Sequence, residues 1–139
     1  MPSTAALSPS TALRLGVAVV AAAAVNTVIA LAASALDDGG TGMGLNPAAY
    51  LPATVLGVLI GAAGWGLIAR RSPRALRVVV PVVLVLTWIP DVLQLTAGAT
   101  AANVAGLMLM HLAVTGAVVL ALRPTLRVPV VPAPAPHVG

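Results

Sequence analysis

The stretch VVVPVVLVLTWIPDVLQLTA, residues 78–97, decides how the chain must fold. It contains a single charged residue, Asp91, in a setting of Val and Leu. About 20 apolar residues are enough for a helix to cross the core of a bilayer. The residues that depart from this apolar pattern gather at Thr87-Trp88-Ile89-Pro90-Asp91-Val92-Leu93-Gln94. The stretch therefore predicts a membrane span and, within it, the position of a functional site.

The composition of the whole chain supports a lipid environment. Of its 139 residues 60% are hydrophobic and only 7% are charged, and the mean hydropathy is +1.07. Soluble domains carry about 25% charged residues, so this chain cannot cover a water-facing surface. It has no Cys, which excludes disulfides and thiolate chemistry.

Three further apolar segments, 15–35, 51–69 and 102–122, join the span at 78–97. The sequence thus predicts an all-α membrane protein, a four-transmembrane-helix bundle over residues 15–122. Residues 1–14 are expected to be an N-terminal cytoplasmic lead-in, and 123–139, rich in Pro, a disordered cytoplasmic tail. The alternative for the first segment is a signal peptide cleaved near Ala33-Ser34-Ala35.

The Arg residues indicate the orientation in the membrane. With four spans, Arg14, the loop Arg70–Arg77, Arg123 and Arg127 fall on one side, and the acidic loop 36–50 falls on the other. The positive-inside rule then predicts cytoplasmic termini in a multi-pass protein of the cytoplasmic (inner) membrane. A nucleic-acid patch is the alternative for the basic loop, but its place between two spans favours the topological role, so no nucleic-acid partner is expected.

Asp91 is the sharpest functional signal. A charged side chain inside the bilayer costs at least ~2.5–3.5 kcal/mol, so it normally faces a partner in the bundle. With a rise of about 1.5 Å per residue, Asp91 lies about 9 Å from the outer end of its span, and His111 and Asn26 lie roughly 13–14 Å from theirs. The similar depths predict a catalytic acid/base pair of Asp91 and His111.

Other polar residues extend this cluster. Thr87 and Gln94 share a helix face with Asp91, and Thr115 lies one turn after His111. We expect a pocket that opens towards the outer side and holds a lipophilic small molecule, with or without acid/base catalysis; whether the chain is an enzyme stays open. The predicted ligand-binding residues are Asn26, Thr87, Trp88, Gln94 and Thr115.

Two other interpretations of the cluster stay open. A hydrogen-bonded Asp91–His111 pair could serve only to fix the register of the helices. The pair could also belong to a proton-coupled carrier, which at this size would need to oligomerise to enclose a path.

A second feature is a face of small residues. Ala53, Gly57 and Gly61 recur every four residues and allow helix backbones to approach closely. The first interpretation is a packing seam inside the bundle. The alternative is a seam for a homo-oligomer or another membrane protein, which would make the chain a structural or accessory subunit.

No metal or cofactor site is predicted. Met108 and Met110 beside His111 suggest copper, but Met in an apolar helix is far more often a packing residue. Asp37 and Asp38 show no ligand spacing with His111.

Asn26, Trp88-Ile89-Pro90-Asp91 and Met110-His111, spread over about residues 12–123, give the chain a general resemblance. It resembles the small four-helix membrane proteins of high-GC bacteria that form families of unknown function. In size and topology it is also broadly similar to the DoxX-like proteins. The resemblance implies a membrane bundle and no established activity.

Overall fold

The computed structural model describes residues 8–40 and 42–126, and within these ranges the regular elements are all helical. Each of the four long helical segments is long and apolar enough to cross a membrane. The predicted four-helix membrane bundle is therefore confirmed. The helices are α1 (Pro9–Leu36), α2 (Pro47–Arg71), α3 (Leu76–Leu93) and α4 (Ala101–Leu122), with short 3-10 turns η1 (Pro73–Ala75), η2 (Gln94–Ala97) and η3 (Arg123–Leu126).

Local signals in the sequence fix where the helices begin. The side chains of Ser8, Asn46 and Thr100 each accept a hydrogen bond from the backbone N–H three residues further on, at the starts of α1, α2 and α4. Such caps satisfy N–H groups that lack a partner in the first turn. After η2, Gly98 adopts a left-handed conformation, with φ of +89°, and turns the chain into α4.

Several boundaries differ from the expected ones. Residues 9–14, expected in the lead-in, already belong to α1, because the Ser8 cap lies before them. The third span, expected from residue 78, begins at Leu76, so that α3 contains both Pro81 and Pro90. Residues 123–126, expected in the tail, form η3, and 127–139 lie outside the described residues.

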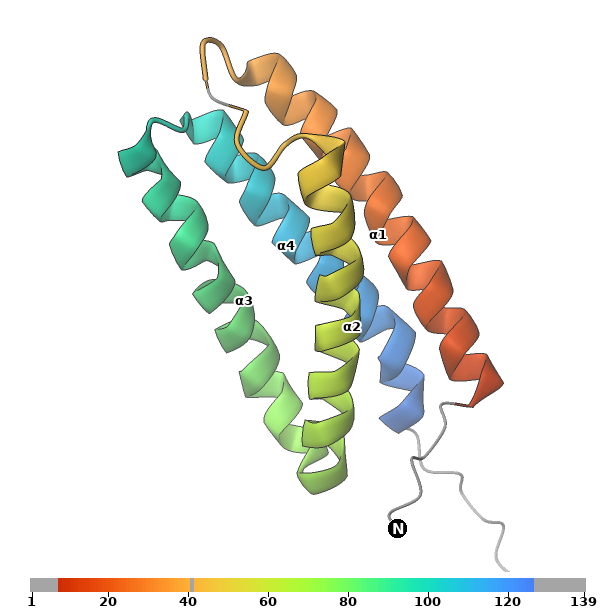
Figure 1. The fold of residues 1–139 in the computed structure, drawn as a ribbon. Coiled ribbons are helices and arrows are strands. Elements are labelled where there is room, and N and C mark those ends of the chain that lie inside the picture. Colours follow the sequence, from red (N-terminus) through yellow and green to blue (C-terminus); the bar gives the residue numbers. More distant parts are fainter. Residues whose placement is uncertain (1–7, 41, 127–139) are drawn as a thin grey trace, which may run out of the picture.

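Helix α4 is the centre of the bundle. It packs most extensively against α1 and also contacts both α2 and α3. In Figure 1, α2 and α3 meet at the turn that joins them and diverge towards their other ends, with α4 behind the space between them. Few contacts join α2 directly to α3, so these two helices are held together mainly through α4.

The close approach of α1 and α4 depends on small side chains. Ala18, Ala22 and Ala30 of α1 are buried at spacings that place them on one face. A Cβ added at Gly106 of α4 would lie 2.6 Å from the Cβ of Ala33. Small residues at such a contact let two membrane helices pack backbone to backbone.

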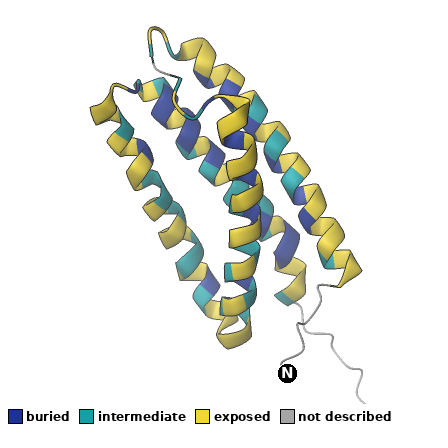
Figure 2. Cartoon of the chain, in the orientation of Figure 1, coloured by how far each residue is buried: buried dark blue, intermediate teal, exposed yellow. Residues whose placement is uncertain are grey.

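The outside of the bundle is apolar. Large hydrophobic side chains such as Val20, Leu59, Val85 and Leu120 are exposed, one from each long helix. Figure 2 shows exposed residues along the outer faces and buried ones where helices meet. Acyl chains rather than water suit such a surface.

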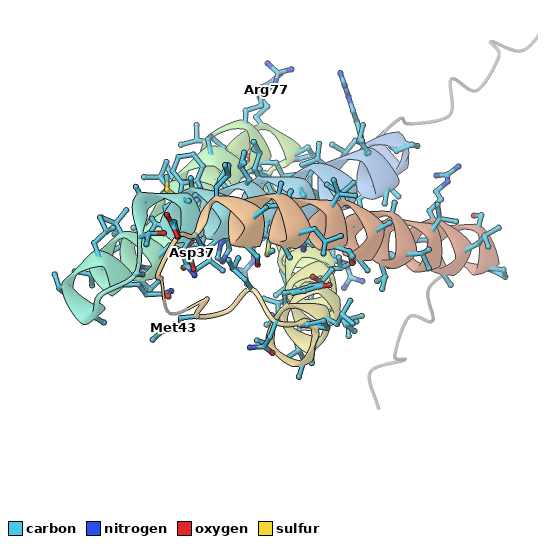
Figure 3. The ribbon with its side chains drawn as sticks, turned by 90° about the horizontal axis from the view of Figure 1, so that it is seen from above. Asp37, Met43 and Arg77 are labelled. Atoms are coloured by element: carbon cyan, nitrogen blue, oxygen red, sulfur yellow. The ribbon has the colours of Figure 1, made fainter. Side chains whose placement is uncertain are left out.

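Apart from Asp91, the charged side chains of the described residues lie towards the two ends of the bundle. Arg14, Arg70–Arg77 and Arg123 belong to the end where α1 starts, α2 turns into α3 and α4 finishes. Figure 3 shows Arg77 projecting away from the bundle, whereas Asp37 lies at the other end, where α1 finishes. We refer to the Asp37 end as the outer end, following the predicted orientation.

Candidate functional site

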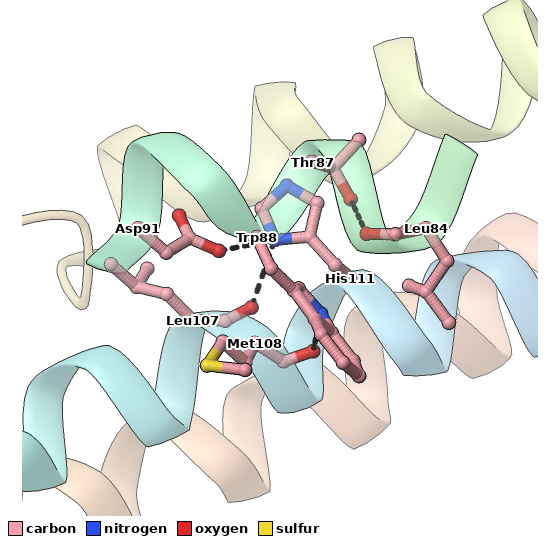
Figure 4. Close-up of polar contacts among 7 residues, drawn as sticks. All are labelled: Leu84, Thr87, Trp88, Asp91, Leu107, Met108 and His111. Atoms are coloured by element: carbon pink, nitrogen blue, oxygen red, sulfur yellow. Dashed lines mark hydrogen bonds and ion pairs between the residues drawn. The ribbon is translucent and has the colours of Figure 1, made fainter. Parts of the chain in front are cut away.

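The structure brings Asp91 and His111 together across the contact between α3 and α4. Asp91 Oδ2 lies 2.9 Å from His111 Nδ1. One turn before Asp91, the Trp88 indole N–H donates a hydrogen bond of 3.1 Å to the carbonyl of Met108. Figure 4 shows both contacts joining the same two helices. The indole anchors α3 on α4 and thereby positions the Asp91 carboxyl group beside the His111 ring.

The His111 ring has a second acceptor close to Nδ1. The carbonyl oxygen of Leu107, one turn earlier on α4, lies 3.0 Å from this nitrogen. The Nδ1 hydrogen is directed at Leu107, so buried Asp91 Oδ2 contacts the ring without a well-directed hydrogen bond of its own. Because a carbonyl oxygen can only accept, the hydrogen bond to Leu107 requires a neutral ring to carry its proton on Nδ1, and Nε2 is then an acceptor.

A cavity of about 680 Å³ lies between α2 and α3, with α4 as its floor. This volume falls in the range of small-molecule sites. Along α2 the cavity lining runs from Ala49 to Ile68, which at about 1.5 Å per residue corresponds to ~28 Å, close to the thickness of the bilayer core. Most lining residues are apolar; the polar or aromatic ones are Asn26, Tyr50, Thr54, Trp65, Thr87, His111 and Thr115.

The predicted ligand-binding residues divide into two groups. Asn26, Thr87 and Thr115 line the cavity together with His111. Trp88 is instead bound to α4, and Gln94 lies in η2 with its Oε1 buried and without a partner among the described residues. Neither of these two is among the residues that line the cavity, and neither is Asp91. Asp91 would therefore act on a bound molecule only through the His111 ring.

The predicted polar cluster of Asn26, Asp91, Gln94 and His111 does not form as one unit. Asn26 Nδ2 donates a hydrogen bond of 2.7 Å to Thr54 Oγ1 on α2, and Thr54 in turn donates to the carbonyl of Tyr50 at 2.7 Å. Sequence analysis missed both α2 residues. Their spacing of four, which places them on one helix face, is the signal that could have found them.

The small-residue face packs inside the chain. Cβ atoms added at Gly57 and Gly61 would lie 3.0 Å from Val114 and 3.1 Å from Val118, both on α4. Ala53, one turn earlier, lines the cavity. The two glycines thus let α2 pack directly on α4 at positions that follow His111 along α4. Both glycines also line the cavity, where they add no side chain to its wall.

The outer loop is fastened by Asp37 and Asn103. The Asp37 carboxylate accepts hydrogen bonds from the Thr100 hydroxyl and, at 3.0 Å, from the Gly42 N–H. Asn103 Nδ2 donates to the Met43 carbonyl at 3.2 Å. Figure 3 shows Asp37 and Met43 at this end of the bundle. Among the described residues no three His, Cys, Asp or Glu side chains lie close enough together to hold a metal ion.

A family model described as a family of unknown function, DUF6069, matches residues 7–128. The match spans all four helices and both residues of the Asp91–His111 pair. No curated protein and no solved structure matches the chain.

Proposed function

We propose that this chain, which belongs to the DUF6069 family of unknown function, binds a lipophilic small molecule in the cavity between α2 and α3. The observation that carries the proposal is the cavity itself: about 680 Å³, walled almost entirely by apolar side chains, with His111 among the few polar ones. Ligand sites typically combine a mostly apolar wall with a small number of placed polar groups.

The position of the cavity suits a ligand that arrives from the bilayer. Its two side walls belong to α2 and α3, which have few direct contacts with each other. A molecule dissolved among the acyl chains therefore has to displace little protein structure to enter. Each methylene group moved from water into an apolar site contributes about 0.8 kcal/mol, so such ligands are already concentrated in the membrane.

The Asp91–His111 pair extends the proposal to acid/base chemistry. Asp91 and the Leu107 carbonyl orient the ring through Nδ1, and His111 lines the cavity. A ring fixed in this way can take a proton from a bound molecule and return it at another position, as an isomerase or cyclase requires. In this role His111 is the catalytic residue and Asp91 the positioning residue.

The proposal also includes the setting suggested by the sequence: the inner membrane of a bacterium with a high-GC genome, with cytoplasmic termini. The likeness to DoxX-like proteins in size and topology belongs with it. The rival role, an accessory subunit that offers its small-residue face to a partner, receives less support. Gly57 and Gly61, which would form that face, lie against α4 of the same chain.

Two glycines of α2 provide a matched test. Gly64 lines the cavity and Gly66 does not, and a Cβ added at either one meets no atom within 4 Å. Gly64→Leu should fill part of the cavity and strip the co-purified lipid that native mass spectrometry detects on the wild type, whereas Gly66→Leu should retain it. If both variants carry the same bound lipid as the wild type, or if the wild type carries none, the proposal fails.

A further inference from the structure

Three of the hydroxyl groups that line the cavity, those of Tyr50, Thr54 and Thr87, already donate their protons inside the protein. Thr54 donates to the Tyr50 carbonyl, and Thr87 donates to the Leu84 carbonyl, each at 2.7 Å. The Tyr50 hydroxyl donates to Thr27 on α1 at 3.1 Å. What these groups can still offer a ligand is acceptor capacity.

Asn26 makes this bias stronger. Its side chain is 1% exposed and lines the cavity. Since the single proton of the Thr54 hydroxyl is directed at Tyr50, Asn26 must present its NH₂ group to Thr54, which fixes the orientation of the amide. Asn26 Oδ1 is then left buried with no donor among the described residues. A buried acceptor without a partner is costly, so a ligand that donates to it is favoured.

The register of α2 and α4 places His111 at the same depth. Gly57 lies against Val114 and Gly61 against Val118, so residues of the two helices 57 positions apart are level. Thr54, three residues before Gly57, is accordingly level with His111, three residues before Val114. Asn26, bonded to Thr54, completes a polar level of the cavity formed by Asn26, Thr54 and His111.

The rest of the cavity suits a chain. The lining residues of α2 from Thr54 to Ile68 are 14 helical steps apart, or ~21 Å at about 1.5 Å per step. An extended chain advances about 1.2 Å per bond, so roughly 17 bonds fit in this length. No Arg, Asp or Glu of the described residues lines the cavity, so no side chain of fixed charge is in place to pair with an ionic headgroup.

We infer that the ligand is an uncharged single-chain lipid with a hydrogen-bond-donating head, such as a long-chain alcohol. Its hydroxyl group donates to Asn26 Oδ1 at the level of His111, and its chain extends towards Trp65. The inference rests on the proposed function and specifies the ligand class for the same cavity. It differs from a general affinity for lipid because it requires a donor and rejects a carboxylate.

Matched ligands test this on the wild-type protein in phosphatidylcholine nanodiscs, with empty nanodiscs correcting for partitioning. Radiolabelled hexadecan-1-ol is displaced by unlabelled hexadecan-1-ol, hexadecyl methyl ether or palmitate. We expect the alcohol to compete about tenfold more strongly than the ether, which has no donor, and palmitate to compete no better than the ether. Equal competition by alcohol and ether would overturn the inference while leaving lipid binding in place. If hexadecan-1-ol does not bind at all, the inference fails; the proposed function fails with it only if the wild type also carries no co-purified lipid.

Two variants locate the contact. Asn26→Leu, close in shape, should reduce the preference for alcohol over ether at least threefold. Leu59→Ala, at an exposed position of α2 that does not line the cavity, should leave that preference unchanged. Trp65, whose buried indole N–H has no partner among the described residues, is the donor at the other end of the cavity. If Trp65→Phe alone abolishes the preference, the ligand has the opposite orientation and the assignment to Asn26 is wrong. If hexadecan-1-ol does not enter the cavity, and cross-linking instead detects a second copy of the chain there, the occupant is protein and the inference is overturned.

Discussion

His111 Nδ1 lies 2.9 Å from Asp91 Oδ2, and this contact joins the two helices that flank one side of the cavity. The two side chains differ in environment: 6% of the Asp91 side chain is exposed, against 40% of His111. The carboxyl group is buried behind the ring, and the ring faces the space where a ligand would lie. Asp91 thus orients the imidazole ring, and His111 is the residue that would contact a ligand.

The pair predicts a characteristic pattern of stabilities. His111→Leu should lower the free energy of unfolding by up to ~3 kcal/mol, because it leaves the Asp91 carboxyl group in the membrane without its partner. The double variant Asp91→Leu/His111→Leu should be less destabilised than His111→Leu alone, since two apolar residues leave no unpaired polar group. Unfolding in mixed micelles measures both values. If the loss in the double variant equals the sum of the losses measured for His111→Leu and Asp91→Leu separately, the side chains are not coupled.

The acid/base form of the proposal predicts exchange of hydrogen at carbon. When the protein with its co-purified lipid is incubated in D₂O, His111 should remove a C–H proton and return a deuteron. Mass spectrometry should then detect deuterium that persists after back-exchange in H₂O. Asp91→Asn should slow the incorporation while bound lipid is retained, because it disturbs the orientation of the ring. If the lipid bound to the wild type gains no deuterium, the acid/base form of the proposal is wrong and only the proposed lipid binding remains.

The contact between α1 and α4 should be intolerant of even one added methyl group. Gly106→Ala places a Cβ 2.6 Å from that of Ala33, and overpacking of this kind typically costs 1–3 kcal/mol. Gly116→Ala on the same helix is the matched control, because a Cβ there meets nothing within 4 Å. It should be neutral or stabilising by up to ~1 kcal/mol. Equal effects of the two substitutions on the unfolding free energy would contradict the close packing of these helices.

The outer loop offers a contrast between neighbouring acids. Asp37→Ala removes the acceptor for both Thr100 and Gly42, so amide exchange in residues 42–45 and at the start of α4 should accelerate about tenfold or more. Asp38 is exposed and makes no hydrogen bond among the described residues, so Asp38→Ala should leave exchange unchanged. Hydrogen–deuterium exchange mass spectrometry distinguishes the two. Similar rates in both variants would mean that Asp37 does not fasten the loop.

The four spans could be predicted because the length of an apolar run determines whether a helix can cross a bilayer. The pairing of helices could not. In α1, exposed Val17 and buried Ala18 are both apolar, so hydrophobicity does not distinguish the face that meets lipid from the face that meets α4. Small size is the distinguishing property, as Gly106 against Ala33 illustrates.

The candidate site was predictable to a similar extent. Asp91 and His111 stood out because each is polar in an apolar span, and their depths matched. Asn26 stood out equally, yet its partner is Thr54, because a lone amide can face any neighbour and depth alone does not choose among them. The cavity had no sequence signal: it results from the divergence of α2 and α3, whose lining residues are mostly Val, Leu, Ile, Ala and Gly.

The central claim is that a lipid occupies this cavity, and photo-cross-linking tests it most directly. A hexadecan-1-ol with a diazirine near the end of its chain is irradiated with the protein in phosphatidylcholine nanodiscs, and labelled residues are identified by mass spectrometry. We predict labels on cavity residues such as Val79, Ile68 and Val118, which excess unlabelled alcohol suppresses, while labels on outward-facing Val85 and Leu86 persist. Labelling spread over all lipid-facing residues, with none of it competed, would contradict the claim.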